Sequence, residues 1–125
     1  LEETLVDVSV SLSSSSQVID AAKNKRCTPE SQEYLDTFKS AISHVDVISI
    51  ISIDGTRIYH TNKDLIGTVY DGTKPDFKTN GDIYITSDTG PSGAQRRAYV
   101  ALYDEGTYQG FALVVLLNQN INKSV

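Results

Sequence analysis

The chain has 125 residues, 39% of them hydrophobic and 22% charged, so it is long and apolar enough to fold as one domain without disulfides or metals. Sixteen acidic residues against eleven basic ones, with no basic stripe, exclude the charge pattern of a nucleic-acid-binding protein. The single cysteine, Cys27, excludes an internal disulfide framework and a cysteine-rich zinc site.

Two amphipathic helices are predicted at the start. Residues 1–27 repeat apolar side chains in steps of four and three, which predicts one leading helix that continues through the serines at 13–16. Its seam consists of Leu1, Leu5, Val8, Leu12, Ser15, Ile19 and Ala22. This seam can pack on the domain itself or on a second copy, as a weak homodimer. The Thr-Pro-Glu motif at 28–30 combines a cap, a first-turn proline and an acidic residue, so residues 28–44 are predicted as the second helix.

Residues 45–117 are predicted to form a sheet and its binding loops. Five β-rich segments span residues 45–53, 56–60, 82–87, 95–104 and 110–117. Asp54-Gly55 predicts a two-residue turn between the first two segments, and residues 88–94 a loop between the third and fourth. Residues 61–81 lack a sustained period, which indicates a long crossover of a kind that often carries function. Helices followed by antiparallel strands indicate an α+β fold.

The two helices are expected to cover one face of this sheet. In the fourth strand the apolar residues Ala98, Val100 and Leu102 share a face, because successive residues of a strand point to opposite sides. Arg97 and Tyr99 therefore share the other face. Only the helices offer apolar surfaces large enough to cover the face of Ala98, so we expect both helices there.

Polar residues on the strands are the candidates for chemistry. Arg57 and His60 are three residues apart, so they share a face only if the strand ends or bulges near Tyr59. Arg97 also points away from the apolar face. The pattern alone leaves a solvated sheet face as the alternative to a binding site.

The sequence contains no pattern typical of an enzyme. His44 and His60 lack metal-binding spacing, and the glycine-containing segment 89–93 lacks the ending of a P-loop. Asp71 lies in a turn context and is expected to bond to local backbone. We therefore expect no catalytic residue, no metal and no cofactor. Without methionine or an apolar run of roughly 18 residues, the chain is expected to be a fragment whose membrane spans lie in absent flanks.

Two stretches carry a resemblance to a known family. HVDVISIISIDGTRIYHTNKDLIGT, residues 44–68, has a His-x-Asp before a strand, a glycine turn, Arg-x-x-His and a downstream Ile-Gly. In TGPSGAQRRAYVALYDE, Gly90 precedes Arg97 by seven residues, and an acidic turn at Asp104 follows seven residues later. Together the stretches resemble the sensor domains of the citrate and four-carbon dicarboxylate sensor histidine kinases.

The resemblance implies a PAS-like Cache (PDC) fold, in which a long N-terminal helix backs a five-stranded antiparallel sheet. It also implies a site for a small carboxylate ligand. The implied ligand-binding residues are Arg57, His60, Gly90 with its neighbours Pro91 and Ser92, Arg97 and Tyr99, with Ser49 as a secondary candidate opposite His60. Arginine forks, imidazolium and loop N–H groups are donors suited to carboxylates.

The implied function is sensing by the extracytoplasmic domain of a bacterial membrane receptor, such as a two-component sensor histidine kinase. Tyr99 stands where the family's citrate-binding members have a residue resembling lysine and its dicarboxylate-binding members an aromatic one. Leu113 and Val115 replace smaller residues of the family. We therefore expect a ligand with at most two carboxylates, or with one carboxylate and a neutral polar group, to be preferred over citrate. The alternative is a secreted or surface protein-interaction domain without a small ligand, in which the leading helix mediates association.

Overall fold

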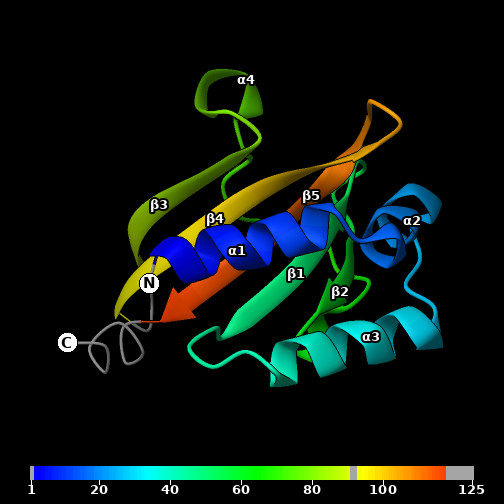
Figure 1. The fold of residues 1–125 in the computed structure, drawn as a ribbon, viewed down its shortest axis with the longest axis horizontal. Coiled ribbons are helices and arrows are strands. Elements are labelled where there is room, and N and C mark those ends of the chain that lie inside the picture. Colours follow the sequence, from blue (N-terminus) through cyan, green and yellow to red (C-terminus); the bar gives the residue numbers. More distant parts are fainter. Residues whose placement is uncertain (1, 91–92, 118–125) are drawn as a thin grey trace.

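The computed structural model describes residues 2–90 and 93–117, which form helices packed on one five-stranded sheet (Figure 1). The helices are α1 (Glu2–Ser13), α2 (Ser16–Asn24), α3 (Pro29–Ser40), the 3-10 helix η1 (Lys63–Leu65) and α4 (Phe77–Asn80). The strands are β1 (Val47–Ser52), β2 (Arg57–His60), β3 (Ile83–Gly90), β4 (Gly93–Asp104) and β5 (Thr107–Leu117). Within these described ranges no helix is long and apolar enough to cross a membrane.

The sheet is antiparallel throughout, in the order β2-β1-β5-β4-β3. The first strand, β1, pairs with the last, β5, in the middle of the sheet (Figure 1). The crossover of residues 61–81 runs from the β2 edge to the β3 edge and carries η1 and α4. The predicted α+β class and the five antiparallel strands are confirmed.

The helices bury the apolar face of the sheet, as expected. α1 crosses this face over β4 and β5 (Figure 1). Leu5, Val8 and Leu12 of α1 belong to one buried cluster with Ala98, Val100 and Leu102 of β4, together with Val18 of α2 and Leu35 of α3. The opposite face of the sheet, which carries Arg97 and Tyr99, is left for other contacts.

The predicted single leading helix is wrong, because the chain breaks at the serine run. Ser15 has an extended backbone (φ −86°, ψ 121°) between α1 and α2. Its hydroxyl accepts a hydrogen bond from the backbone N–H of Val18, so it caps α2 instead of continuing α1. Serine side chains bond readily to nearby backbone, and here that local bond overrides the heptad pattern.

The apolar seam of α1 is covered by the domain's own sheet. Leu5, Val8 and Leu12 are at most 5% exposed. The weak homodimer therefore stays a prediction, and Val6 and Val10, which are 39% and 46% exposed, are the large apolar residues that α1 leaves outside.

The predicted loop over residues 88–94 is mostly strand. Thr89 pairs with Ala94 and Gly90 with Gly93, so β3 and β4 extend toward each other on both sides of residues 91–92. Ladder pairing provides these backbone groups with hydrogen-bond partners and shortens the connection. Pro91 and Ser92 lie outside the described residues, and their ligand contacts stay predictions.

Candidate ligand-binding site

A bulge in the first hairpin brings Arg57 and His60 to the same face of the sheet. Ser49 pairs with His60 and Ile51 pairs with Arg57, so β2 has one residue more than β1 over this interval. The extra residue, Ile58, interrupts the alternation once and turns side chains three positions apart to the same side. The sequence requires a bulge or a strand end near Tyr59 for Arg57 and His60 to share a site, and the structure has this bulge.

The turn of this hairpin has three residues instead of the predicted two. Ser52 N–H donates to the carbonyl of Thr56, and Gly55 has a φ of +89° that suits glycine. Asp54 stabilises the turn by accepting from Thr56 N–H at 3.0 Å and from the Ser52 hydroxyl. The predicted Ser49–His60 pairing nevertheless holds, because the bulge compensates for the longer turn.

Three rows of side chains cross the sheet face opposite to α1. The middle row runs through His60, Ser49, Leu113, Tyr99 and Tyr84. The row on one side contains Arg57, Ile51 and Phe111, and the row on the other side contains Arg97, Val115 and Val47. The two arginines therefore lie diagonally across one face, on either side of the middle row.

The crossover covers this face with aromatic side chains. Tyr70 packs edge-on against Phe111 with ring centroids 5.3 Å apart, and Phe77 packs in the same way against Tyr84 at 5.8 Å. The four rings belong to a second hydrophobic cluster that also contains Tyr99, Leu113 and Val115. We call residues 61–81 the roof, because this segment separates part of the sheet face from solvent.

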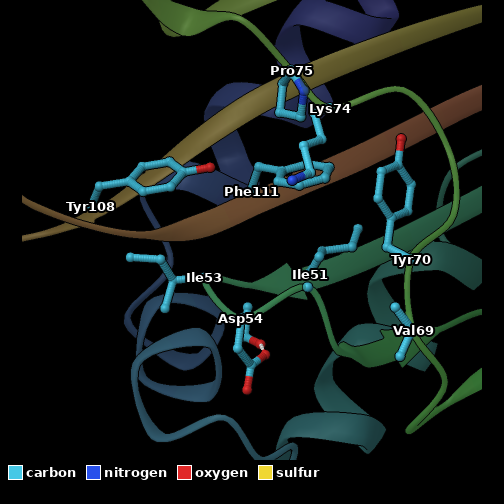
Figure 2. A pocket seen from close by; sticks show the side chains of 11 residues that line it. Ile51, Ile53, Asp54, Val69, Tyr70, Lys74, Pro75, Tyr108 and Phe111 are labelled. Carbon is cyan, nitrogen blue, oxygen red and sulfur yellow. Dashed lines mark hydrogen bonds between the residues drawn. The ribbon is translucent and has the colours of Figure 1, made fainter.

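A cavity of about 360 Å³ lies under the roof beside the first hairpin (Figure 2). It is lined by the turn residues 52–55, by Val69, Tyr70, Lys74 and Pro75 of the roof, and by Ile51, Tyr108 and Phe111 of the sheet. Its volume is in the range of small-molecule sites. The lining does not include any of the described sequence-predicted site residues, but Val69 and Tyr70 also contact Arg57.

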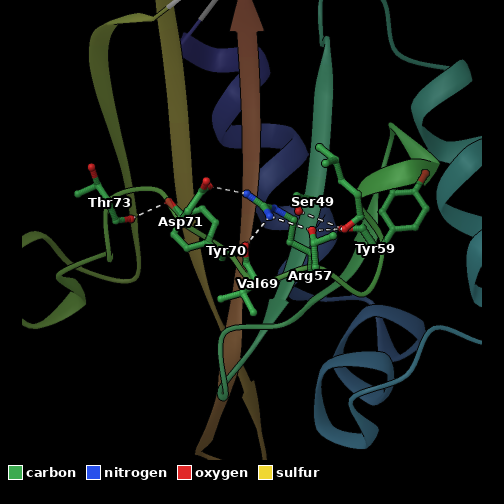
Figure 3. Close-up of polar contacts among 9 residues, drawn as sticks. Ser49, Arg57, Tyr59, Val69, Tyr70, Asp71 and Thr73 are labelled. Carbon is green, nitrogen blue, oxygen red and sulfur yellow. Dashed lines mark hydrogen bonds and ion pairs between the residues drawn. The ribbon is translucent and has the colours of Figure 1, made fainter.

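Arg57 is held against the roof by several contacts (Figure 3). Its Nη1 donates to the carbonyl of Val69 at 2.6 Å and to the hydroxyl of Thr68 at 2.9 Å. Its Nη2 forms an ion pair of 2.8 Å with Asp71, and its guanidinium carbon lies 5.7 Å from the Tyr70 ring centroid. The Arg57 side chain is only 14% exposed, so the charge is largely withdrawn from water.

The hydrogen bonding of His60 matches a neutral imidazole ring. Its Nδ1 accepts from Asn62 N–H at 2.8 Å, so the remaining proton of the neutral ring is on Nε2. Burial, followed by the nearby Arg57 charge, lowers the pKa of His60 below its usual value. An anion next to the ring would oppose both effects.

The roof side chain Tyr70 lies within the electrostatic reach of both arginines. Burial is the main cause that raises the pKa of Tyr70, and the neighbouring Tyr99 raises it further, whereas the charges of Arg97 and Arg57 act in the opposite direction. The Tyr70 hydroxyl donates to the carbonyl of Thr73 at 2.7 Å. Arg57 contacts the Tyr70 ring directly, and the charge of Arg97 also acts on the Tyr70 hydroxyl.

Arg97 and Tyr99 lie next to each other on β4. The Nε and Nη2 atoms of Arg97 donate to the Gln95 side-chain oxygen at 3.0 and 2.7 Å, and the side chain is half-buried. Tyr99 is 2% exposed and stacks on Tyr84 with ring centroids 5.1 Å apart. In this conformation Tyr99 is therefore part of the packed aromatic layer.

Ser49 and Gly90 are less directly placed for a ligand. The Ser49 hydroxyl donates to the backbone carbonyl of Tyr59 at 3.0 Å and is buried. Gly90 is paired with Gly93 at the end of β3. Of the described candidates, the structure thus brings Arg57, His60, Ser49, Arg97 and Tyr99 to one face, with Gly90 at the end of the β3–β4 ladder.

Sequence reasoning missed the roof residues Tyr70 and Asp71. Asp71 was expected to bond to local backbone, whereas its carboxylate accepts from the Arg57 guanidinium 14 residues earlier. The available signal for these two residues was an aromatic residue next to an acidic one in a long irregular crossover.

No protein-family model matches the sequence, and no curated protein matches it either. Solved structures do match. The sensor domain of DcuS from E. coli superposes with a TM-score of 0.69 at 17% identity, covering 96% of this chain and 93% of that one. The chain has the fold of a PAS-like sensor domain.

Two further structures share this fold. The extracellular ligand-binding receptor from Desulfohalobium retbaense has a TM-score of 0.65 at 12% identity, covering 98% of this chain and 22% of the receptor. The extracellular domain of vpHK1S-Z8, described as a histidine kinase, has a TM-score of 0.60 at 13% identity, covering 98% of this chain and 55% of that one. This chain thus spans only part of these two proteins.

Proposed function

We propose that this chain is the extracytoplasmic ligand-sensing domain of a bacterial membrane receptor and that it binds a small dicarboxylate without converting it. The observation that carries the proposal is the placement of Arg57, His60 and Arg97 on one partly roofed face of the sheet. The fold shared with a sensor domain and two extracellular domains supports it.

The register of the sheet supports a ligand with two anionic ends. Arg57 and Arg97 are separated by three strand spacings and four residues along the strands. On a flat sheet this places their Cα atoms about 20 Å apart. Two extended arginine side chains and a short dicarboxylate between them can bridge that distance. The ligand would then lie above Ser49 and Leu113 in the middle row.

Each polar group of the set has a role in this arrangement. The guanidinium groups offer paired donors that match a carboxylate, and His60 offers Nε2–H next to the Arg57 end. The partly buried surroundings strengthen these contacts relative to water. No group in the proposed contact set is arranged as a nucleophile with a base, so we expect binding without turnover.

The floor of the face supports a small ligand over citrate. Leu113 and Val115 are 9% and 6% exposed and form an apolar floor beneath the proposed ligand. Tyr99 lies beside Arg97 in place of a cation. A third carboxylate would therefore lose water without gaining a positive partner, which costs several kcal/mol.

The same strand links the site to the helices. On β4, Arg97 points to the site, whereas its neighbour Ala98 belongs to the cluster that contains α1. A ligand that moves Arg97 and β4 would therefore change the packing of α1. We infer that α1 carries the signal toward the membrane and an output domain such as a histidine kinase.

A ligand panel tests the proposal. Thermal unfolding is measured with succinate, malate, citrate, acetate and several amino acids. A ligand at a hundredfold excess over its dissociation constant adds about 2.7 kcal/mol to the free energy of unfolding. We expect a clear rise of the melting temperature with a dicarboxylate and recovery of the unchanged ligand after incubation. A flat response across the panel would support a protein-interaction domain, and conversion of the ligand would contradict sensing.

A further inference from the structure

Arg57, which is proposed to bind a ligand carboxylate, already binds a carboxylate of the chain. The Asp71 oxygen lies 2.8 Å from Arg57 Nη2 (Figure 3). The other terminal nitrogen, Nη1, is occupied by Val69 and Thr68 of the roof. The Nη2 side of the guanidinium is thus bound by an exposed carboxylate, whereas Nη1 is bound by a backbone carbonyl and a hydroxyl.

The two partners of this ion pair differ strongly in burial. The side chain of Arg57 is 14% exposed and that of Asp71 is 89% exposed. Asp71 can therefore exchange Arg57 for water at low cost, because its carboxylate is almost fully hydrated already. Arg57 has no comparable alternative, since its other contacts hold it beneath the roof. A free carboxylate can take the place of Asp71 and keep the buried charge paired.

We propose that Asp71 is a built-in competitor that a ligand carboxylate must displace from Arg57. This inference rests on the proposed function and adds a residue that sets the affinity and specificity of the same site. The free protein holds Arg57 in an occupied state, so the apparent affinity equals the intrinsic affinity multiplied by the fraction of molecules in which Arg57 is open. Only a ligand that engages Arg57 carries this penalty.

Asp71 also connects ligand entry to the roof. It follows Tyr70 directly, and Tyr70 packs on Phe111 and contacts Arg57. Gly72 is in close contact with the Tyr70 ring, because a Cβ at Gly72 would lie 2.6 Å from the Tyr70 hydroxyl oxygen. Release of Asp71 therefore frees one anchor of the segment that covers the cavity and the sheet face.

The test compares Asp71→Asn with Asp64→Asn. Both variants remove one negative charge from the roof, but Asp64 is exposed in η1 and is not the partner of Arg57. Calorimetry with succinate should show about fivefold tighter binding to Asp71→Asn than to the wild type, the factor expected for an exposed ion pair. Asp64→Asn should bind within about twofold of the wild type, and Arg57→Ala should lose most of the affinity. Unfolding of each variant without ligand verifies that it folds.

The outcomes separate this inference from the proposed function. If Asp71→Asn binds succinate no more tightly than Asp64→Asn while Arg57→Ala loses binding, Asp71 is not a competitor and the carboxylate site remains. Weaker binding by Asp71→Asn would make Asp71 part of the ligand-holding roof and also overturn the inference. If neither the wild type nor Asp71→Asn binds any carboxylate, the proposed function fails and the inference fails with it.

Discussion

Replacing Arg97 by alanine tests the centre of the proposed site. Arg97 is half-buried, with Nε and Nη2 within 3.0 Å of the Gln95 side chain. Removing one partner of a desolvated charge pair costs about 2–5 kcal/mol. Because Arg97 keeps access to water, we expect the lower part of this range, about 2–3 kcal/mol, which corresponds to about 30- to 150-fold weaker binding of succinate or malate. Arg97→Lys should lie in between, because it keeps the charge and loses the fork.

The adjacent Arg96 provides the matched control. It directly precedes Arg97 on β4, pairs with Leu116 of β5 and points to the opposite face, so Arg96→Ala removes the same charge without entering the site. Isothermal titration calorimetry measures the dissociation constants, and thermal unfolding without ligand verifies the fold. Equal losses for Arg96→Ala and Arg97→Ala would mean that long-range charge alone determines binding, and the placement of the ligand between the two arginines would be refuted.

Three further predictions concern proton linkage, ligand choice and the sheet. Burial and Arg57 lower the pKa of His60, so the unfolded chain binds more protons than the folded one just below about pH 6.5, the ordinary pKa of histidine. The free energy of unfolding without ligand should therefore fall as the pH drops through this window. A bound carboxylate should raise the pKa of His60, so ligand binding should take up a proton. Calorimetry in two buffers of different ionisation enthalpy at about pH 6.5, the ordinary pKa of histidine, measures this uptake. It should vanish in His60→Gln and persist in His44→Asn. Succinate and malate should bind at least tenfold more tightly than citrate by calorimetry, and the reverse order would refute the role given to Tyr99. Gly110→Ala should destabilise the domain by about 3 kcal/mol or more in urea unfolding, because the added Cβ would lie 2.1 Å from the Ile51 carbonyl oxygen at a φ of +131°. Gly106→Ala has open space around it and should cost only about 1 kcal/mol.

The fold could be predicted because it depends on local patterns that agree with one another. The β-branched run before Asp54-Gly55 predicts the first hairpin, and the alternation around Val100 tells which face the helices cover. The break at Ser15 could not be predicted in the same way. The heptad spacing continues across it, so the pattern is equally satisfied by one helix or two, and the capping bond to Val18 decides.

The face of the candidate site could be predicted only conditionally. In a regular strand Arg57 and His60 would point to opposite faces of the sheet, because they are three residues apart. The single extra residue Ile58 turns both to the same face. A bulge has no strong sequence signal, because any residue can be the extra one when the turn and the ladder together demand it. Here the three-residue turn and the bulge are coupled: the turn adds one residue on the β1 side of the hairpin, and the bulge restores the pairing of Ser49 with His60.

The contacts of the roof could not be predicted from the sequence for a different reason. Asp71 can bond to local backbone or to a distant cation, and sequence favours the local bond because the alternative requires knowing where an irregular segment of 21 residues lies. That position is determined by packing of Tyr70 on Phe111 and of Phe77 on Tyr84, across more than one strand. Once those rings are placed, Asp71 reaches Arg57, and a residue expected to shape a turn becomes the partner of a cation that is only 14% exposed.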